Sequence, residues 1–266
     1  MLESLVSFQE INKKPYLVFI WALIISTVAI FVSRQISYSV TIGEHVFDMT
    51  GLFSVLFTVI PSVSFITLLL KKEEKMEEEY VKEHYEKAFW IRHEKDLTVM
   101  LLFFAGLTLS FAVWAYILPE NFFQVQLQKI NEIHGISGAA SYKYYTFTQI
   151  LNNNLQVMFF SFLFSFIFGS GAIFIIAWNA SILGVYIGQL AESLWGIPIV
   201  GLSFVPHGLP EIAGYICAGL AGGIMSAMII RKNTKHIKEI VAFDSIKLLI
   251  LGTFLIFIAA IIEVYL

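Results

Sequence analysis

Phe204-Val-Pro-His-Gly-Leu-Pro-Glu-Ile-Ala-Gly-Tyr-Ile-Cys-Ala-Gly-Leu-Ala-Gly-Gly223 is an apolar, glycine-rich run that contains two ionisable residues, His207 and Glu211. Ionisable groups at membrane depth cost free energy, so they normally face a bundle interior, a cavity or a partner. The 266 residues are 58% hydrophobic and 14% charged, whereas soluble proteins carry about 25% charged residues. The sequence therefore predicts a polytopic membrane protein, with this run inside it.

Membrane-spanning helices need about 20 apolar residues, and five segments supply them. They are Leu17–Ser33, Met49–Leu70, Leu97–Leu118, Leu155–Trp178 and Ile246–Tyr265. The intervening segment 179–230 is apolar but interrupted by Gly and Pro. We expect two short crossings there, near 180–196 and 208–230, joined by an irregular, partly buried turn; a re-entrant element is the alternative. The predicted fold is an all-α transmembrane bundle of six or seven membrane segments, with short, broken or re-entrant helices around 180–230.

Basic residues predict the orientation of the chain in the cell membrane. Of the 17 Lys and Arg residues, all but Arg34, Lys129 and Lys143 lie before the first span, between spans two and three, or around the last connection. These regions are alternate connections between the spans, so they lie on one side of the membrane. Because they hold most of the basic residues, we expect that side to be the cytoplasmic one. The N-terminus is then cytoplasmic and the C-terminus external, in a multi-pass protein.

Two regions divide the chain in this interpretation. Residues 1–96 form a two-span region that ends in a charged cytoplasmic connection, Lys71–Asp96, whose i,i+4 charge pairs favour a helical hairpin. Residues 97–266 form a second membrane region with an external loop, 119–154. Aromatic residues in that loop are typical of an interfacial helix, although a binding surface for an extracytoplasmic protein remains the alternative.

Several polar residues near the spans are candidates for functional or structural roles. Asn152, Asn153 and Asn154 stand where the fourth predicted span begins, where one asparagine can cap a helix and the others can hydrogen-bond between helices. Glu192 follows a stripe of small residues that would carry it into the protein interior, unless it reaches the headgroup region. Glu263 is the fourth-last residue of the sequence given and is compatible with an external position.

His207 and Glu211 are the strongest candidates. A helix that begins at Pro210 would place Glu211 in its first turn, where backbone N–H groups and the helix dipole favour a carboxylate. His207 would then precede the helix, and the two side chains would not share a face. Hydrogen bonding at a helix end and a role in transport or catalysis remain equally open for Glu211.

Small residues recur at four-residue spacing in two segments and predict close helix packing, because tight van der Waals contact holds helices together in lipid. We expect the two stripes to pack closely, with each other as one arrangement. The stripes contain Ala180, Gly184 and Gly188 in one segment, and Gly214, Ala218, Gly222 and the G-x-x-x-G pair Gly219 and Gly223 in the other.

The sequence carries no catalytic pattern. A zinc site needs three or four ligands, and His207 is the one histidine within an apolar segment. The single cysteine, Cys217, excludes an intrachain disulfide. No phosphate-binding glycine loop is present, and the net charge of −3 argues against nucleic acid. We expect neither an enzyme nor a bound metal or cofactor.

The run Pro206-His-Gly-Leu-Pro-Glu211, with the glycines that follow it, resembles the signature of the stage II sporulation protein M family of integral membrane proteins. The resemblance covers about residues 95–266 and extends to Asn152–Asn154, Asn179 with Gly184, and Glu263. Here Pro210 precedes the glutamate, whereas the family often has Leu-Pro after it. In endospore-forming bacteria, the resemblance implies a multispanning scaffold that recruits cell-wall-degrading partners; members also occur in archaea.

Two functional hypotheses follow. The first is a membrane scaffold or assembly protein that binds membrane or extracytoplasmic proteins, with self-association left open. The second is a channel or transporter with a polar pathway at His207 and Glu211, since transporter sites use broken helices with polar groups at mid-membrane.

Overall fold

The computed structural model describes residues 14–36, 38–42, 45–64, 66, 89–138, 143–230 and 235–265. Its helices are α2 (Tyr16–Ile36), a helix over Thr50–Ser64, α4 (Phe89–Ile117), the 3₁₀ turn η2 (Glu120–Phe122), α5 (Gln124–Gly138), α6 (Lys143–Phe168), α7 (Ala172–Leu190), α8 (Gly196–Ile230) and α9 (Lys235–Tyr265). Six of these helices, α2, α4, α6, α7, α8 and α9, contain stretches long and apolar enough to cross a membrane. The predicted all-α membrane bundle is confirmed.

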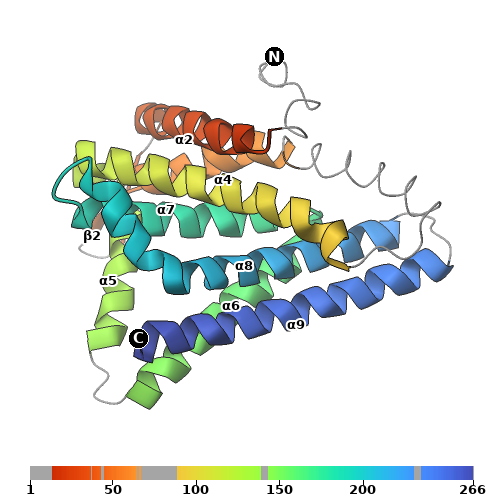
Figure 1. Ribbon diagram of the computed structural model, residues 1–266. Helices are drawn as coiled ribbons and strands as arrows, with labels where there is room; N and C mark the ends of the chain where they lie inside the picture. The colour runs from red at the N-terminus through yellow and green to blue at the C-terminus, as the bar shows by residue number, and fades with distance from the viewer. Residues whose placement is uncertain are drawn as a thin grey trace.

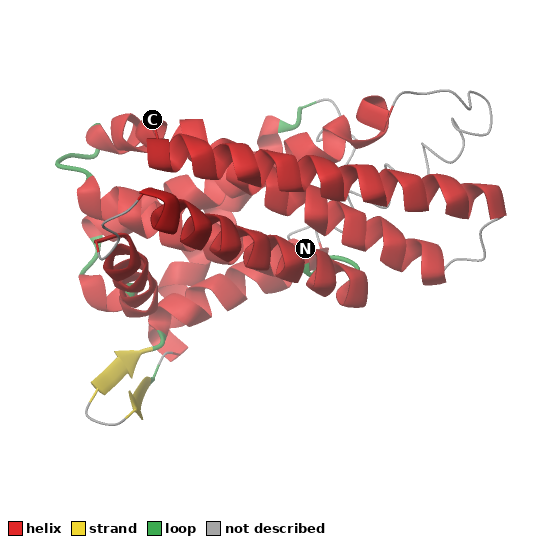
Figure 2. Cartoon of the chain, turned by 90° about the horizontal axis from the view of Figure 1, so that it is seen from below, coloured by secondary structure: helices red, strands yellow, loops and turns green. Residues whose placement is uncertain are grey.

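Among the described residues, two strands form a short antiparallel hairpin. Strands β1 (Ser39–Ile42) and β2 (His45–Asp48) pair with Ser39 opposite Asp48. Figure 2 shows the hairpin at one end of the helical bundle. In Figure 1, α5 and the end of α9 lie at that same end, while the end of α8 and the start of α9 lie at the other.

The long helices form two groups. In the first group, α2 packs on α4 and α4 packs on α7; in the second, α8 packs on both α6 and α9. Figure 1 shows the first group in the upper half of the view and the second below it. The N-terminal part of α8 also packs on α4 and α7, where Ile197 contacts a small cluster with Ala112 and Ile187. α8 therefore belongs to both groups.

The fourth predicted span, 155–178, is wrong in its boundaries because the chain turns in its middle. α6 ends at Phe168, and Gly169 adopts a positive φ of 75°, which glycine tolerates without steric cost. The N–H of Gly169 donates to the carbonyl of Ser165 at 2.7 Å, and the N–H of Ala172 donates to the Ser165 hydroxyl at 2.8 Å. These bonds end α6 and begin α7.

The segment 179–230 consists of the end of α7 and the whole of α8. A turn over 191–195 joins the two helices, and Glu192 to Trp195 are exposed in it. The predicted pair of crossings matches these helices better than a re-entrant element does. The joining turn, however, comes earlier than predicted and is largely exposed.

The predicted two-region division places its boundary at residue 96, which lies inside α4, and one hydrophobic cluster includes residues from α2 through α9. The external loop 119–154 is mostly helical, because α5 and the first turns of α6 occupy it. Of the charged connection Lys71–Asp96, residues 71–88 lie outside the described residues.

Candidate functional site

The run that contains His207 and Glu211 lies within one continuous helix. Pro206 and Pro210 are both inside α8, where each lacks the N–H that would bond four residues back. The carbonyls of Leu202 and Pro206 therefore lose their helical donors. Figure 1 shows the N-terminal part of α8, in teal, running in a different direction from the longer remainder. Prolines are the usual cause of a sharp helix bend, so the predicted break is a bend.

His207 is half-buried between the two prolines, in the helix rather than before it as predicted. Its ring lies edge-on to Phe204, with 5.8 Å between ring centroids. Phe204 in turn packs edge-on against Tyr186 of α7, at 5.4 Å. The histidine thus lies where the first part of α8 contacts α7.

Glu211 lies one turn beyond His207 in the same helix, so the prediction that it begins a helix is wrong. Because the helix is continuous, the two residues share a face by spacing, but the glutamate bonds elsewhere. The hydroxyl of Tyr215 donates to Glu211 Oε1 at 2.7 Å. Tyr215 is 1% exposed, and its carbonyl accepts a bond from the Ser161 hydroxyl of α6 at 2.8 Å.

Two other candidate carboxylates have different surroundings. Glu263, in α9, lies close enough to Glu211 and Tyr215 to interact with both electrostatically. Glu192 is exposed in the turn before α8, and its carbonyl accepts a long bond of 3.5 Å from the Tyr116 hydroxyl. The expected interior position of Glu192 is wrong, because the small-residue stripe ends with α7 before the chain turns outward.

The asparagines do not begin a helix. Asn152, Asn153 and Asn154 lie in the interior of α6, which starts nine residues earlier at Lys143. Asn154 is 4% exposed and its Oδ1 accepts a bond of 3.3 Å from Asn153 Nδ2. Asn179 uses its amide within α7, donating to the Ile175 carbonyl at 2.8 Å.

The candidate packing glycines lie against neighbouring helices, but the two stripes do not pack on each other. A Cβ added at Gly184 or Gly188 would approach a carbonyl oxygen of α4 to 2.5 or 2.4 Å. One added at Gly214 would meet Ile256 of α9 at 2.7 Å. The later part of the second stripe faces α6 and the turn after it: Gly219 and Gly222 lie against them, Gly223 approaches the Gly169 carbonyl, and Ala218 is fully buried.

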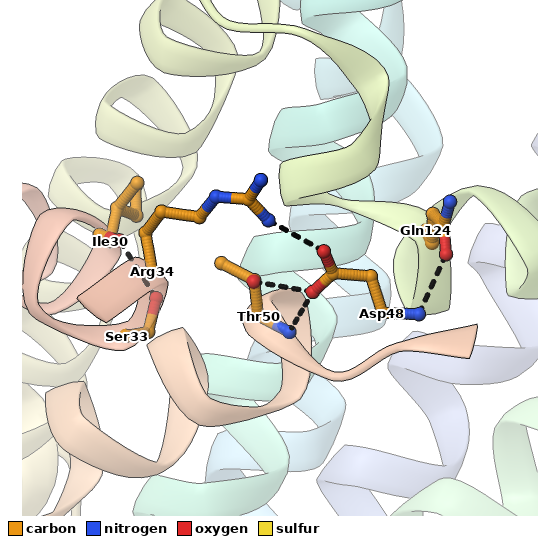
Figure 3. A network of polar contacts seen from close by, with 6 residues as sticks. All are labelled: Ile30, Ser33, Arg34, Asp48, Thr50 and Gln124. Carbon is orange, nitrogen blue, oxygen red and sulfur yellow. Dashed lines mark hydrogen bonds and ion pairs between the residues drawn. The ribbon is translucent and has the colours of Figure 1, made fainter. Parts of the chain in front are cut away.

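A polar network at the end of the bundle near the hairpin was not anticipated from the sequence (Figure 3). Asp48 accepts an ion-pair bond of 2.6 Å from Arg34 of α2. Its other oxygen accepts bonds from the hydroxyl and, at 2.8 Å, the N–H of Thr50, where the Thr50–Ser64 helix begins. The Asp48 N–H donates to Gln124 Oε1 of α5 at 2.7 Å. The guanidinium of Arg34 also lies 5.0 Å from the Phe122 ring centroid.

Gln126 extends this network into the core. It is fully buried, and its Nε2 lies 2.9 Å from the Gly51 carbonyl and 3.3 Å from the Ser181 hydroxyl of α7. A Cβ added at Gly51 would approach Gln126 Oε1 to 2.0 Å. Gln124 and Gln126 together attach α5 to three other elements. The Gln-x-Gln spacing in the predicted external loop was one signal in the sequence for these two residues. Nothing in the sequence indicated their hydrogen-bond partners.

A second unanticipated cluster lies at the opposite end. His93, in the first turns of α4, has its Nε2 3.5 Å from Asp244 Oδ2 of α9. Lys247 Nζ lies 3.6 Å from the other Asp244 oxygen and 5.6 Å from the Phe89 ring centroid. His93 and Asp244 are 7% and 3% exposed, so the cluster joins α4 and α9 through buried polar groups. Among the described residues, no group of three His, Cys, Asp or Glu is arranged to hold a metal ion.

Comparison with known proteins places the chain among integral membrane proteins. The family model described as stage II sporulation protein M matches residues 98–266. The chain is also similar to an uncharacterized protein of Methanocaldococcus jannaschii, with 30% identity over 143 residues that cover 52% of this chain and 80% of the relative. No solved structure matches. With six apolar helices long enough to cross a membrane, the chain is a multi-pass membrane protein that belongs to the stage II sporulation protein M family.

Proposed function

We propose that this protein is a non-catalytic membrane scaffold that recruits partner proteins at the outer face of the cell membrane. The observation that carries the proposal is the attachment of α5. Its buried side fixes it to the Thr50–Ser64 helix and α7 through Gln126, and its first residue bonds the Asp48 backbone. Its other side presents Gln128, Asn131 and Glu132 as exposed polar residues.

A polar helix held in this way suits protein recognition. Binding costs less when the surface is already ordered, because fewer side chains and backbone segments lose freedom on association. Bonds from α5 reach β2, the Thr50–Ser64 helix and α7, so tilting it would break contacts to several elements at once. Within residues 124–132, the exposed residues of α5 are polar.

The proposed orientation follows from the charges. Arg34 and Lys129 lie in the elements near the hairpin end, whereas Lys95, Lys238 and Lys247 lie near the other end, in α4 and in the first turns of α9. Cytoplasmic ends of membrane proteins carry the excess of basic residues. The hairpin end, with α5, is therefore the external end in this proposal.

Site-specific photocrosslinking in living cells tests the scaffold. A photoreactive amino acid at Gln128 or Asn131 should yield a discrete protein adduct, because these side chains point away from the buried side of α5. The matched control is Ile250, which is 65% exposed on the apolar face of α9 and should react mainly with lipid. Equal protein adducts at Ile250, or none at either α5 position, would contradict the proposal.

A channel or transporter is the second candidate, and the bend of α8 favours it. The Glu211–Tyr215 hydrogen bond follows directly after the bend, and Glu263 lies nearby on α9. Broken helices whose ends carry polar groups form transport sites in other membrane proteins. In liposomes, Glu211→Gln should alter a proton or cation flux, while Glu192→Gln, in the exposed turn, should not. Wild-type protein without flux across a broad solute panel would end this candidate.

A further inference from the structure

α6 is the least covered of the candidate spans. Within its most apolar window, 22% of the residues are buried, compared with 33% to 61% for the other five spans. Its buried side, which includes Asn154, Met158, Ser161 and Ser165, faces α8 and α9. The opposite side is open along most of the helix.

That open side carries amides at membrane depth. Asn152, Asn153 and Gln156 are exposed, and they follow the start of the apolar span at Thr146 by six to ten residues, or about 9–15 Å along the helix. Among the described residues, the side-chain amides of Asn152 and Gln156 make no hydrogen bond, and that of Asn153 bonds only Asn154. Lipid tails offer amides no hydrogen-bond partner, so such groups favour contact with another polar surface.

The same side becomes apolar and mainly aromatic further along, where Ile167 is also exposed. Phe160, Phe164 and Phe168 follow at four-residue intervals, with ring centroids 6.4 and 6.1 Å apart. All three are exposed, at 45%, 36% and 67%. The open side thus has an amide section followed by a phenylalanine section, and the segment Thr146–Phe168 contains no charged residue.

We propose that the open side of α6 binds the same side of a second copy of this chain. Two copies with one orientation in a membrane are related by a two-fold axis along the membrane normal. Each residue then lies at the same depth as its own copy, and residues next to the axis meet their own copies. Amides then meet amides at equal depth, and each can both donate and accept. Phenylalanines meet phenylalanines. The polar and apolar sections therefore match themselves without any other molecule, whereas a lipid neighbour leaves the amides unpaired.

Cysteine cross-linking in native membranes tests the pairing. Asn153→Cys and Phe160→Cys should each form a disulfide-linked dimer on mild oxidation. The control is Ile250→Cys, which is exposed on α9 and not on α6, and the native Cys217 is buried at 1% exposure. Dimers at both α6 positions and not at Ile250→Cys support the proposal. Equal cross-linking at all three positions, or none on α6, overturns it.

Dilution in lipid gives a second measurement that needs no cysteine variant. Dye-labelled wild-type protein in liposomes should show energy transfer that falls as lipid is added. The combined change Asn152→Leu, Asn153→Leu and Gln156→Leu should weaken association at least tenfold. A wild-type protein that is monomeric at every dilution, or a triple variant that associates as strongly as the wild type, overturns the proposal. In the cross-linking experiment, adducts of α6 with a different protein only would also overturn it. Partner capture by α5 is independent of each of these outcomes.

Discussion

Gly222→Ala is the sharpest test of the packing between α6 and α8. The added Cβ would lie 2.3 Å from the Phe162 carbonyl oxygen and 2.9 Å from the Phe166 nitrogen. Both are backbone atoms, so no side chain can rotate away. Reaching ordinary contact at 3.4 Å would require the two helices to separate by about 1 Å, which would also disturb the Ser161–Tyr215 bond.

The expected cost follows from two opposing effects. Overpacking a tight interface costs about 1–3 kcal/mol, while replacing a helical glycine with alanine returns roughly 1 kcal/mol of helix propensity. We expect a net loss of up to about 2 kcal/mol, which corresponds to a melting temperature up to about 8 °C lower. Gly208→Ala is the matched control, because Gly208 lies in the same helix and an added Cβ meets nothing within 4 Å. It should be neutral or raise the melting temperature.

Cys217 supplies the assay. It is the one cysteine of the chain and is 1% exposed in α8, near Gly252 of α9. A fluorogenic thiol reagent therefore reacts when α8 separates from its neighbours, and a thermal ramp in mild detergent reports the midpoint. Equal midpoints for Gly222→Ala and Gly208→Ala would refute the packing argument.

Four further predictions concern polar contacts and topology. Asp48→Ala should lower stability by about 1–2 kcal/mol, because it removes the ion pair with Arg34 and the hydrogen bonds to Thr50 at the start of its helix. Asp48→Asn keeps a side-chain oxygen that can accept a hydrogen bond and should cost less; the same thiol assay measures both variants. In a double-mutant cycle, Tyr215→Phe and Glu211→Gln should show coupling of about 1 kcal/mol, and additive effects would contradict the hydrogen bond. Asp244→Asn should lower the melting temperature more than His93→Ala, since it leaves two basic partners without a carboxylate. Reporter fusions should place the N-terminus in the cytoplasm and the C-terminus outside, and termini on one side would contradict the charge argument.

The length of the hydrophobic segments predicted the helical spans well, but the residues at which helices end were harder to predict. The segment 155–178 is apolar throughout, so length alone hid the turn at Gly169, where a single left-handed backbone conformation reverses the chain. Pro206 and Pro210 suggested a break because proline disfavours helices in water. In α8 the helix continues on both sides of them, since tight packing on α6 and α9 stabilises its second part.

The residues of the candidate site were also predicted only in part. His207 and Glu211 were found because they are ionisable residues in an apolar run. Tyr215 was not singled out, although a helix that begins at Pro210 already places it one turn after Glu211. Asp48 and Gln124 are separated by 76 positions, and the pairing of such distant loop residues depends on how the helices pack, which a single sequence does not reveal.

The bend of α8 bears on how the protein fits membranes of different thickness. A straight helix of 35 residues would be about 52 Å long, well beyond a hydrocarbon core of about 30 Å. The 20 residues from Glu211 to Ile230 match that core by themselves, which leaves the first part of α8 to run along the membrane surface. A change in bilayer thickness would then be accommodated by a change of angle at the bend, where the carbonyls of Leu202 and Pro206 lack helical donors. α8 can thus adjust the length that spans the membrane without tilting the whole bundle.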